Sequence, residues 1–119
     1  HKGAKVQWTA MGDGCVDMKT LFNEWSVACP ETPVQIETIS GFAKEFPYLE
    51  KDFWPPYSTI RADDYSRFLA LSRKGRVLSP FSAPEGVDKK KAQQDYQLAE
   101  LERSFVYCRN HLGMGRKTT

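Results

Sequence analysis

The sequence of 119 residues lacks any apolar run near the roughly 20 residues that a membrane-spanning helix needs, so no such helix is expected. Cysteine is also scarce. The three cysteines, Cys15, Cys29 and Cys108, are widely separated, and none has a second cysteine or a histidine at metal-ligand spacing. Because three thiols cannot all pair, we expect buried thiols rather than a disulfide framework, and a reducing compartment, the cytoplasm.

An excess of charge of one sign is absent as well. The chain has 17 basic and 15 acidic residues and 40% hydrophobic residues, which are ordinary values for a globular domain. The longest basic run, residues 89–91, is followed by acidic residues and is typical of a solvated helix face. The opening letters HKGAKVQW lack the apolar core of a signal peptide. The composition therefore predicts neither a nucleic-acid partner nor a membrane partner.

Three segments show the periodicity of amphipathic helices. The spacing predicts helices over 17–27, 63–74 and 88–112, with Asp17 as the N-cap of the first and Gly75 as the C-terminal cap of the second. The final letters, GMGRKTT, are expected to fray.

Two of these helices carry apolar stripes. The stripe of the first consists of Met18, Leu21, Phe22 and Trp25. The stripe of the third consists of Leu98, Leu101, Phe105 and Leu112. We expect the third helix to dock through its stripe on the outside of the fold or on another subunit, as in a homo-oligomer, rather than to line a cofactor groove.

Strand character is limited to two segments, KVQWTA near the start and residues 34–40, VQIETIS. A sheet needs more strands than this, and a lone strand would leave its backbone groups without partners. The aromatic, proline-rich segment 41–61 is too long and too apolar for a flexible linker and is expected to pack on something. The chain therefore reads as the end of a larger structure.

Glu37 lies in the middle of the strand predicted at 34–40. Side chains alternate along a strand, so Gln35, Glu37 and Ile39 face one way, and Val34, Ile36 and Thr38 face the other. A buried carboxylate needs a cation, an arginine or a metal, because an isolated buried charge is very costly. The alternative is an edge strand with Glu37 in water, and spacing alone does not decide between the two.

The order of motifs resembles the C-terminal part of the sugar phosphate isomerase/epimerase family, the xylose isomerase-like barrels. GDGCVD, residues 12–17, is similar to that family's G-E-G-x-x-D loop, with Asp13 in place of the usual Glu, and it is followed by a helix, by PVQIETISGF and by FPYLEKDFW. The resemblance covers about residues 4–75. It implies an α/β fold, the last βα units of an incomplete (β/α)8 TIM barrel over 1–83, with a helical extension over 84–119.

The same resemblance implies a site and a chemistry. Glu37 falls on the family's metal-binding glutamate, so it is the expected metal ligand and catalytic residue, for Mn²⁺, Mg²⁺, Co²⁺ or Zn²⁺. Asp13 and Trp54 are the expected substrate-binding neighbours. The implied reaction is the isomerisation or epimerisation of a small sugar or polyol through an enediolate. The other ligands would precede residue 1, and neither His1 nor His111 matches one, so this chain is not expected to be active alone.

Each of these residues also has an ordinary structural role open to it. The glycines of MGDG, residues 11–14, suit a phosphate cradle, but a short loop between elements is the more common reason for such a pair. Asp13 is a candidate turn residue, and Trp54 a candidate core residue, as well as a wall over a sugar. A second function of another class also fits: a self-contained, mainly helical interaction module, with Glu37 on the surface and the stripe of 88–112 offered to a partner.

Overall fold

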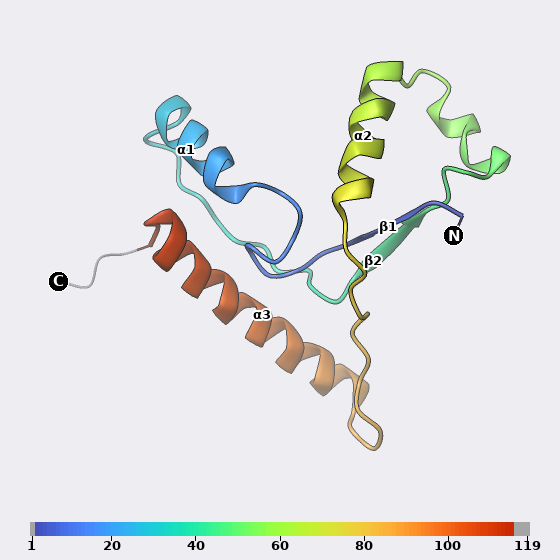
Figure 1. The fold of residues 1–119 in the computed structure, drawn as a ribbon. Helices are drawn as coiled ribbons and strands as arrows, with labels where there is room; N and C mark the ends of the chain where they lie inside the picture. The colour runs from blue at the N-terminus through green and yellow to red at the C-terminus, as the bar shows by residue number, and fades with distance from the viewer. Residues whose placement is uncertain (1, 116–119) are drawn as a thin grey trace.

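The computed structural model describes residues 2–115 (Figure 1). In chain order, its elements are the strand β1, Ala4–Gln7, the helix α1, Met18–Ala28, the strand β2, Ala43–Phe46, two 3-10 turns, Lys51–Phe53 and Pro55–Tyr57, the helix α2, Ala62–Lys74, and the long helix α3, Lys89–Leu112. Figure 1 shows a short ribbon of two strands in the middle, with α2 on one side, and α1 and α3 on the other.

The two strands are antiparallel neighbours. Ala4 lies opposite Phe46 and Gln7 opposite Ala43. The ladder is extended by the Trp8 N–H, which donates to the Phe42 carbonyl at 3.1 Å, and the rings of these two residues lie 5.0 Å apart. A β-ribbon of this size is stable only when other elements cover it.

The expectation of βα units from a (β/α)8 barrel was therefore wrong. The described residues contain a two-stranded antiparallel sheet and no repeat of parallel βα units. The strand predicted over 34–40 is also wrong, because residues 32–39 have no regular secondary structure. β-branched residues favour a strand only where a neighbouring strand accepts and donates the ladder hydrogen bonds, and the segment has no such neighbour within 2–115.

The predicted helices are confirmed, and local capping explains where they begin. Asp17 accepts the Thr20 N–H at 3.1 Å, as an N-cap does, and this contact holds the pKa of the Asp17 carboxyl below its usual range. Asp88 accepts the Lys91 N–H at 2.8 Å at the start of α3. Gly75 ends α2, as predicted, but in an extended rather than a left-handed conformation.

An aromatic cluster joins α2 to the segment that follows β2. The ring of Phe68 lies 6.2 Å from Phe46 and 5.5 Å from Tyr48, and the rings of Tyr65 and Trp54 are 5.1 Å apart. The indole N–H of Trp54 donates to the Tyr48 carbonyl at 3.0 Å. The expectation that segment 41–61 packs on something is confirmed, although the sequence did not reveal that its first residues form β2.

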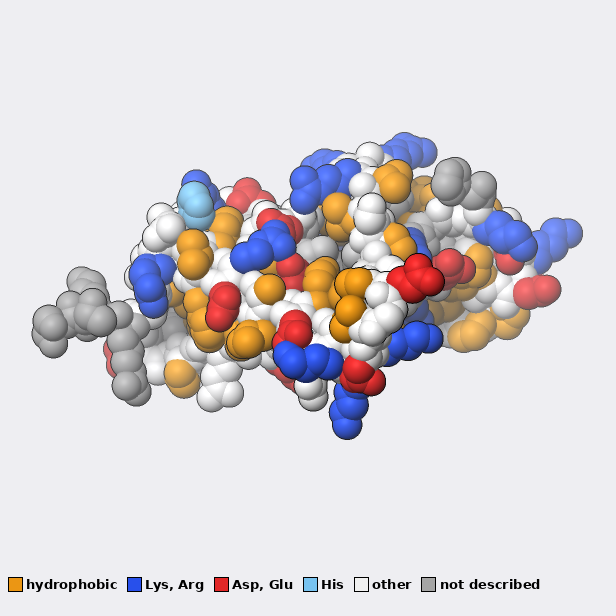
Figure 2. Space-filling view, turned by 90° about the horizontal axis from the view of Figure 1, so that it is seen from below, with side chains coloured by type: hydrophobic (Ala, Val, Ile, Leu, Met, Phe, Trp, Pro, Cys, Tyr) orange, Lys and Arg blue, Asp and Glu red, His pale blue; other side chains and the backbone are white. Residues whose placement is uncertain are grey.

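The chain encloses little apolar volume. Its radius of gyration is 17.6 Å, whereas a compact domain of this length has about 13.5 Å. Its accessible surface is 9981 Å², against about 6,600 Å² for a compact monomer of 13.6 kDa. Among the described residues the buried apolar side chains are Ala10, Ala92 and Cys108. Much apolar surface thus remains in water, as the orange side chains scattered over one face in Figure 2 illustrate.

Other expectations concern the ends and the membrane. No helix within 2–115 is long and apolar enough to cross a membrane. The left-handed Gly113, with φ of 65°, ends α3. The segment GMGRKTT was expected to fray, and its last four residues, 116–119, lie outside the described residues. His1 lies outside them as well.

We predict fast hydrogen exchange in the irregular segment. The backbone N–H groups of residues 34–38 form no hydrogen bond with any described residue, whereas the N–H groups in the middle of α3 are bonded within the helix. Exchange of 34–38 is therefore expected near the rate of an unstructured peptide, and exchange of 96–108 is expected to be slower by at least about 10-fold. Mass spectrometry of peptic peptides measures both, and equal protection of the two segments would contradict the structure.

The three thiols are expected to react in a fixed order. All are free; Cys15 is exposed, Cys29 half-buried and Cys108 buried. Burial also raises the pKa of the Cys108 thiol, so less of the reactive thiolate is present at any given pH. Iodoacetamide should modify Cys15 first and Cys108 last, as followed by peptide mapping. Modification of Cys108 before Cys15 would show that α3 does not pack as described.

Candidate functional site

The loop after β1 is bound to the middle of α3. The Ala10 N–H donates to Glu100 Oε2 at 2.7 Å, and the Met11 N–H donates to Ser104 Oγ at 2.9 Å. The Ser104 hydroxyl in turn donates to the Glu100 carbonyl at 2.7 Å. Glu100 and Ser104 are only 3% and 4% exposed. Spaced four residues apart, they occupy one face of α3, and this face holds the loop.

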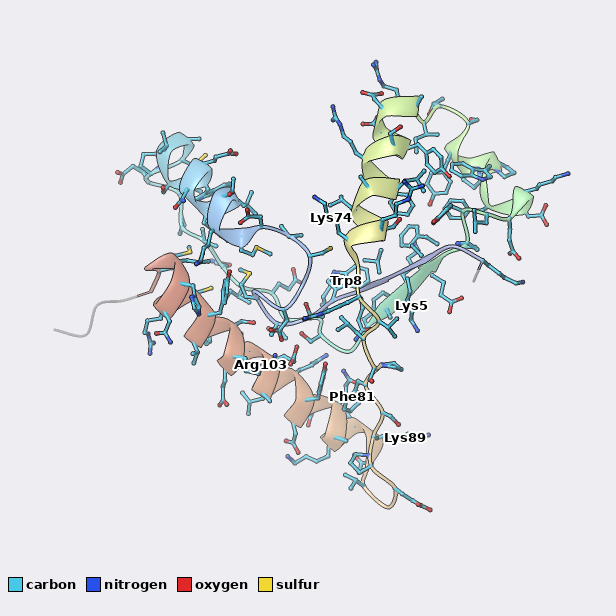
Figure 3. The ribbon with its side chains drawn as sticks, viewed as in Figure 1. Lys5, Trp8, Lys74, Phe81, Lys89 and Arg103 are labelled. Carbon is cyan, nitrogen blue, oxygen red and sulfur yellow. The ribbon has the colours of Figure 1, made fainter. Side chains whose placement is uncertain are left out.

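Two arginines converge on Asp13 in the same loop. Arg103, labelled on α3 in Figure 3, pairs with the carboxylates of Asp13 and Glu100 through its two terminal nitrogens. Arg76, from the connector after α2, donates through Nη2 to the Asp13 carbonyl at 2.7 Å. The carboxylate of Glu100 is thus satisfied by a guanidinium and a backbone N–H. This arrangement makes a buried charge tolerable.

Position 12 requires a glycine because of its backbone conformation and because a side chain there would meet Tyr107. Its φ is +88°, and a Cβ at this position would lie 2.3 Å from Cε2 of Tyr107 on α3. The Asp13 N–H closes the turn by donating to the Ala10 carbonyl at 3.1 Å. Of the two roles open to MGDG, the structure therefore supports the tight loop. The nearby amides of Ala10 and Met11 are already bonded to side chains and do not form a phosphate cradle.

Glu37 lies exposed in the irregular segment between α1 and β2. The hydroxyl oxygen of the next residue, Thr38, is buried and has no hydrogen-bond partner among the described residues. A buried hydroxyl without a partner is unusual in a finished fold. The segment that bears Glu37 thus contains one buried polar group without a partner among the described residues.

The predicted site residues have separate surroundings. Asp13 is engaged by Arg103 and Arg76, whereas Trp54 belongs to the aromatic cluster of α2, and Glu37 is paired with no described residue. Figure 1 shows the 3-10 turns around Trp54 and the loop that precedes α1 on opposite sides of the ribbon. The role of Trp54 that the structure supports is packing. Assignments of Glu37, Asp13 and Trp54 to a catalytic site remain predictions.

Residues 2–115 do not fit a divalent metal by themselves. No three of their His, Cys, Asp and Glu side chains are grouped so that they could hold an ion. His111 lines a hollow of about 250 Å³ between α1 and the end of α3, together with Lys19 and Trp25, but no carboxylate lines that hollow. A divalent ion at Glu37 would need ligands from outside the described part of the chain.

No family model, curated protein or solved structure matched this chain in the comparisons. The resemblance to the isomerase/epimerase family therefore rests on the sequence motifs of residues 12–17, 33–42 and 46–54 alone.

The best-defined polar cluster was not predicted from the sequence. Glu100, Arg103 and Ser104 look like ordinary solvated residues of a charged helix, and their partners lie about 90 positions away in the chain. One signal was available. Ala92, Glu100, Ser104 and Cys108 recur at intervals of four or eight, so small and polar residues follow one side of α3. That side, rather than the leucine stripe, is the one that packs.

The Glu100 carboxylate is expected to control the stability of the loop. Glu100→Ala leaves the Ala10 N–H unsatisfied and frees Arg103, so the local opening free energy should fall by about 1–3 kcal/mol. NMR exchange should show the Ala10 and Met11 amides exchanging at least about 5-fold faster. Asp95→Ala, which removes an exposed pair with Lys91 on the same helix, is the control and should change little. Equal effects of the two variants would refute the anchoring role.

Proposed function

We propose that this chain is one part of a divalent-metal-dependent sugar isomerase or epimerase, inactive alone, in which Glu37 provides one carboxylate ligand. The remaining ligands would come from polypeptide outside the described residues. The reaction class is aldose–ketose isomerisation or epimerisation through an enediolate. The substrate class is a small sugar or polyol, and neither a nucleic acid nor a membrane is a proposed partner.

The observation that carries this proposal is the unfinished environment of the segment that bears Glu37. Its β-branched residues have backbone groups without partners in 34–38, Thr38 has an unsatisfied buried hydroxyl, and Glu37 itself is exposed and unpaired within 2–115. Backbone donors and acceptors in such a row are suited to pairing with a strand of another segment. Pairing would satisfy the segment, and Glu37 would then face the groups that the partner supplies.

The excess surface of the whole chain supports the same conclusion. An accessible area about 3,400 Å² larger than that of a compact monomer is comparable to the area buried in large obligate interfaces. The three free thiols support the cytoplasm as the proposed compartment.

A second candidate function is an interaction module without catalysis. The observation in its favour is the apolar stripe of α3, whose Leu98 and Phe105 are 56% and 51% exposed. In this alternative Glu37 remains an ordinary surface residue. The two candidates differ in what surrounds Glu37 in the complete natural protein, and that difference can be measured.

The first experiment is to read the gene around the codon for His1. The enzyme proposal requires additional coding sequence that supplies the remaining Glu, Asp and His ligands. A start codon immediately before His1 would contradict it and would leave the interaction module.

The second experiment removes the charge of Glu37 in the complete natural gene product. Glu37→Gln keeps the size of the side chain but removes an anionic ligand, so bound Mn²⁺ or Co²⁺ should fall, and turnover should drop at least about 100-fold. Elemental analysis gives the metal content, and a panel of aldoses and ketoses gives turnover. Glu31→Gln, in the turn that follows α1, is the matched control. If Glu37→Gln binds metal and turns over like the parent, Glu37 is not a ligand.

A further inference from the structure

We propose that α3 is a self-association surface, and that it pairs with α3 of a second copy in an antiparallel, two-fold arrangement centred on Phe105. This proposal does not depend on any catalytic role of Glu37. It rests on two faces of α3, an inner face that is buried within the chain and an outer face that carries the leucine stripe. It also rests on the order of the charged residues beside the outer face.

The inner face of α3 is already used within the chain. Ala92, Glu100, Ser104 and Cys108 are buried, and Glu100 and Ser104 hold the loop after β1. At roughly 100° per residue, the centre of the leucine stripe lies about 115° around the helix from the centre of this buried face. Leu112, at one end of the stripe, lines a hollow beside α1, whereas Leu98 and Phe105 remain more than half exposed.

The outer face is apolar and largely uncovered. Leu98 is 56% and Phe105 is 51% exposed, and Leu101 and Leu112 are half-buried. From Leu98 to Leu112 the stripe runs for about 21 Å along the helix. An apolar stripe of this length on a helix of 24 residues is the kind of seam through which helices associate.

The charges beside the stripe point to a second copy of the same chain. Glu102 and Arg109 lie on one flank, one heptad apart, and neither forms an ion pair with any described residue. If the two-fold axis passes at Phe105, residue 98 of one copy meets residue 112 of the other. Glu102 of each copy then lies beside Arg109 of its mate, so that two opposite-charge pairs form at once.

The antiparallel direction follows from the same charges. In a parallel pair, the flank of Glu102 and Arg109 would meet the opposite flank of the other copy, where the uncharged Gln97 lies. In the antiparallel register, the flank of one copy that carries Glu102 and Arg109 meets the same flank of the other copy. Lys91 and Asp95 then lie beyond the end of the other helix, and no like charges are brought together.

Sedimentation velocity of the 119-residue chain over a concentration series tests the proposal. A reversible monomer–dimer equilibrium is expected, and Phe105→Glu should weaken it at least about 10-fold, because a charge would then face its own copy across the axis. Val106→Glu is the matched control. Val106 is 55% exposed on the same helix, but about 110° away from the stripe, so its replacement should leave the equilibrium unchanged. Circular dichroism verifies that both variants keep their helix content.

Charge exchange tests the register. Glu102→Arg and Arg109→Glu should each weaken the dimer by about 10-fold, and the double variant should restore it to within about 3-fold, because the pairs re-form with reversed signs. A chain that remains monomeric at every accessible concentration overturns the proposal. So does association that Val106→Glu disturbs as much as Phe105→Glu, or a double variant that is weaker than either single variant.

Discussion

The salt bridge between Arg103 and Asp13 joins α3 to the loop after β1, and the hydrogen bonds of Glu100 and Ser104 hold the same loop. Arg103 and Glu100 lie on α3, whereas Asp13 and Ala10 lie 90 positions earlier. Closing a loop of this length has an entropic cost, and here several hydrogen bonds offset it together. Because the loop leads directly from β1 into α1, its anchor on α3 also determines where α1 starts.

The same helix fixes a second part of the chain by different means. The amide of Gln93 donates to the Ser40 carbonyl at 3.2 Å, just before the turn at Gly41, whose φ is +87°. The ring of Tyr96 lies 4.5 Å from that of Phe81 in the connector after α2. One helix thus contacts the loop after β1, the turn before β2 and the connector after α2. Among the described residues, the aromatic cluster around α2 and the β1–β2 ladder are formed by other contacts.

The helices were predictable from the sequence, whereas the strand predicted at 34–40 is absent from the structure. Helix formation depends on local periodicity and on caps such as Asp17 and Asp88, which lie within a few residues of the groups they satisfy. A strand depends on partners far away in the sequence, and the hydrophobic pattern of VQIETIS says nothing about whether they exist. For the same reason β2 was missed, because AKEF acquires strand geometry only through its pairing with β1.

In the candidate site, too, local features were predictable and features made by distant residues were not. The separation of Asp13, Trp54 and Glu37 into three environments could not be anticipated, since each environment is made by residues distant in the chain. That Asp13 would meet an arginine on α3 was equally invisible, because the pairing depends on how the loop and helix dock. The prediction that Gly12 belongs to a tight loop needed only the local turn and was correct.

The two faces of α3 respond to salt in opposite directions. Its inner face is held by charged and polar groups, and the Arg103 side chain is 56% exposed, so added salt screens those pairs and loosens the N-terminal loop. Its outer face is apolar, and salts such as sulfate strengthen the burial of apolar surface. The salt concentration therefore shifts α3 between contacts with its own chain, which low salt favours, and contacts with another surface, which high salt favours.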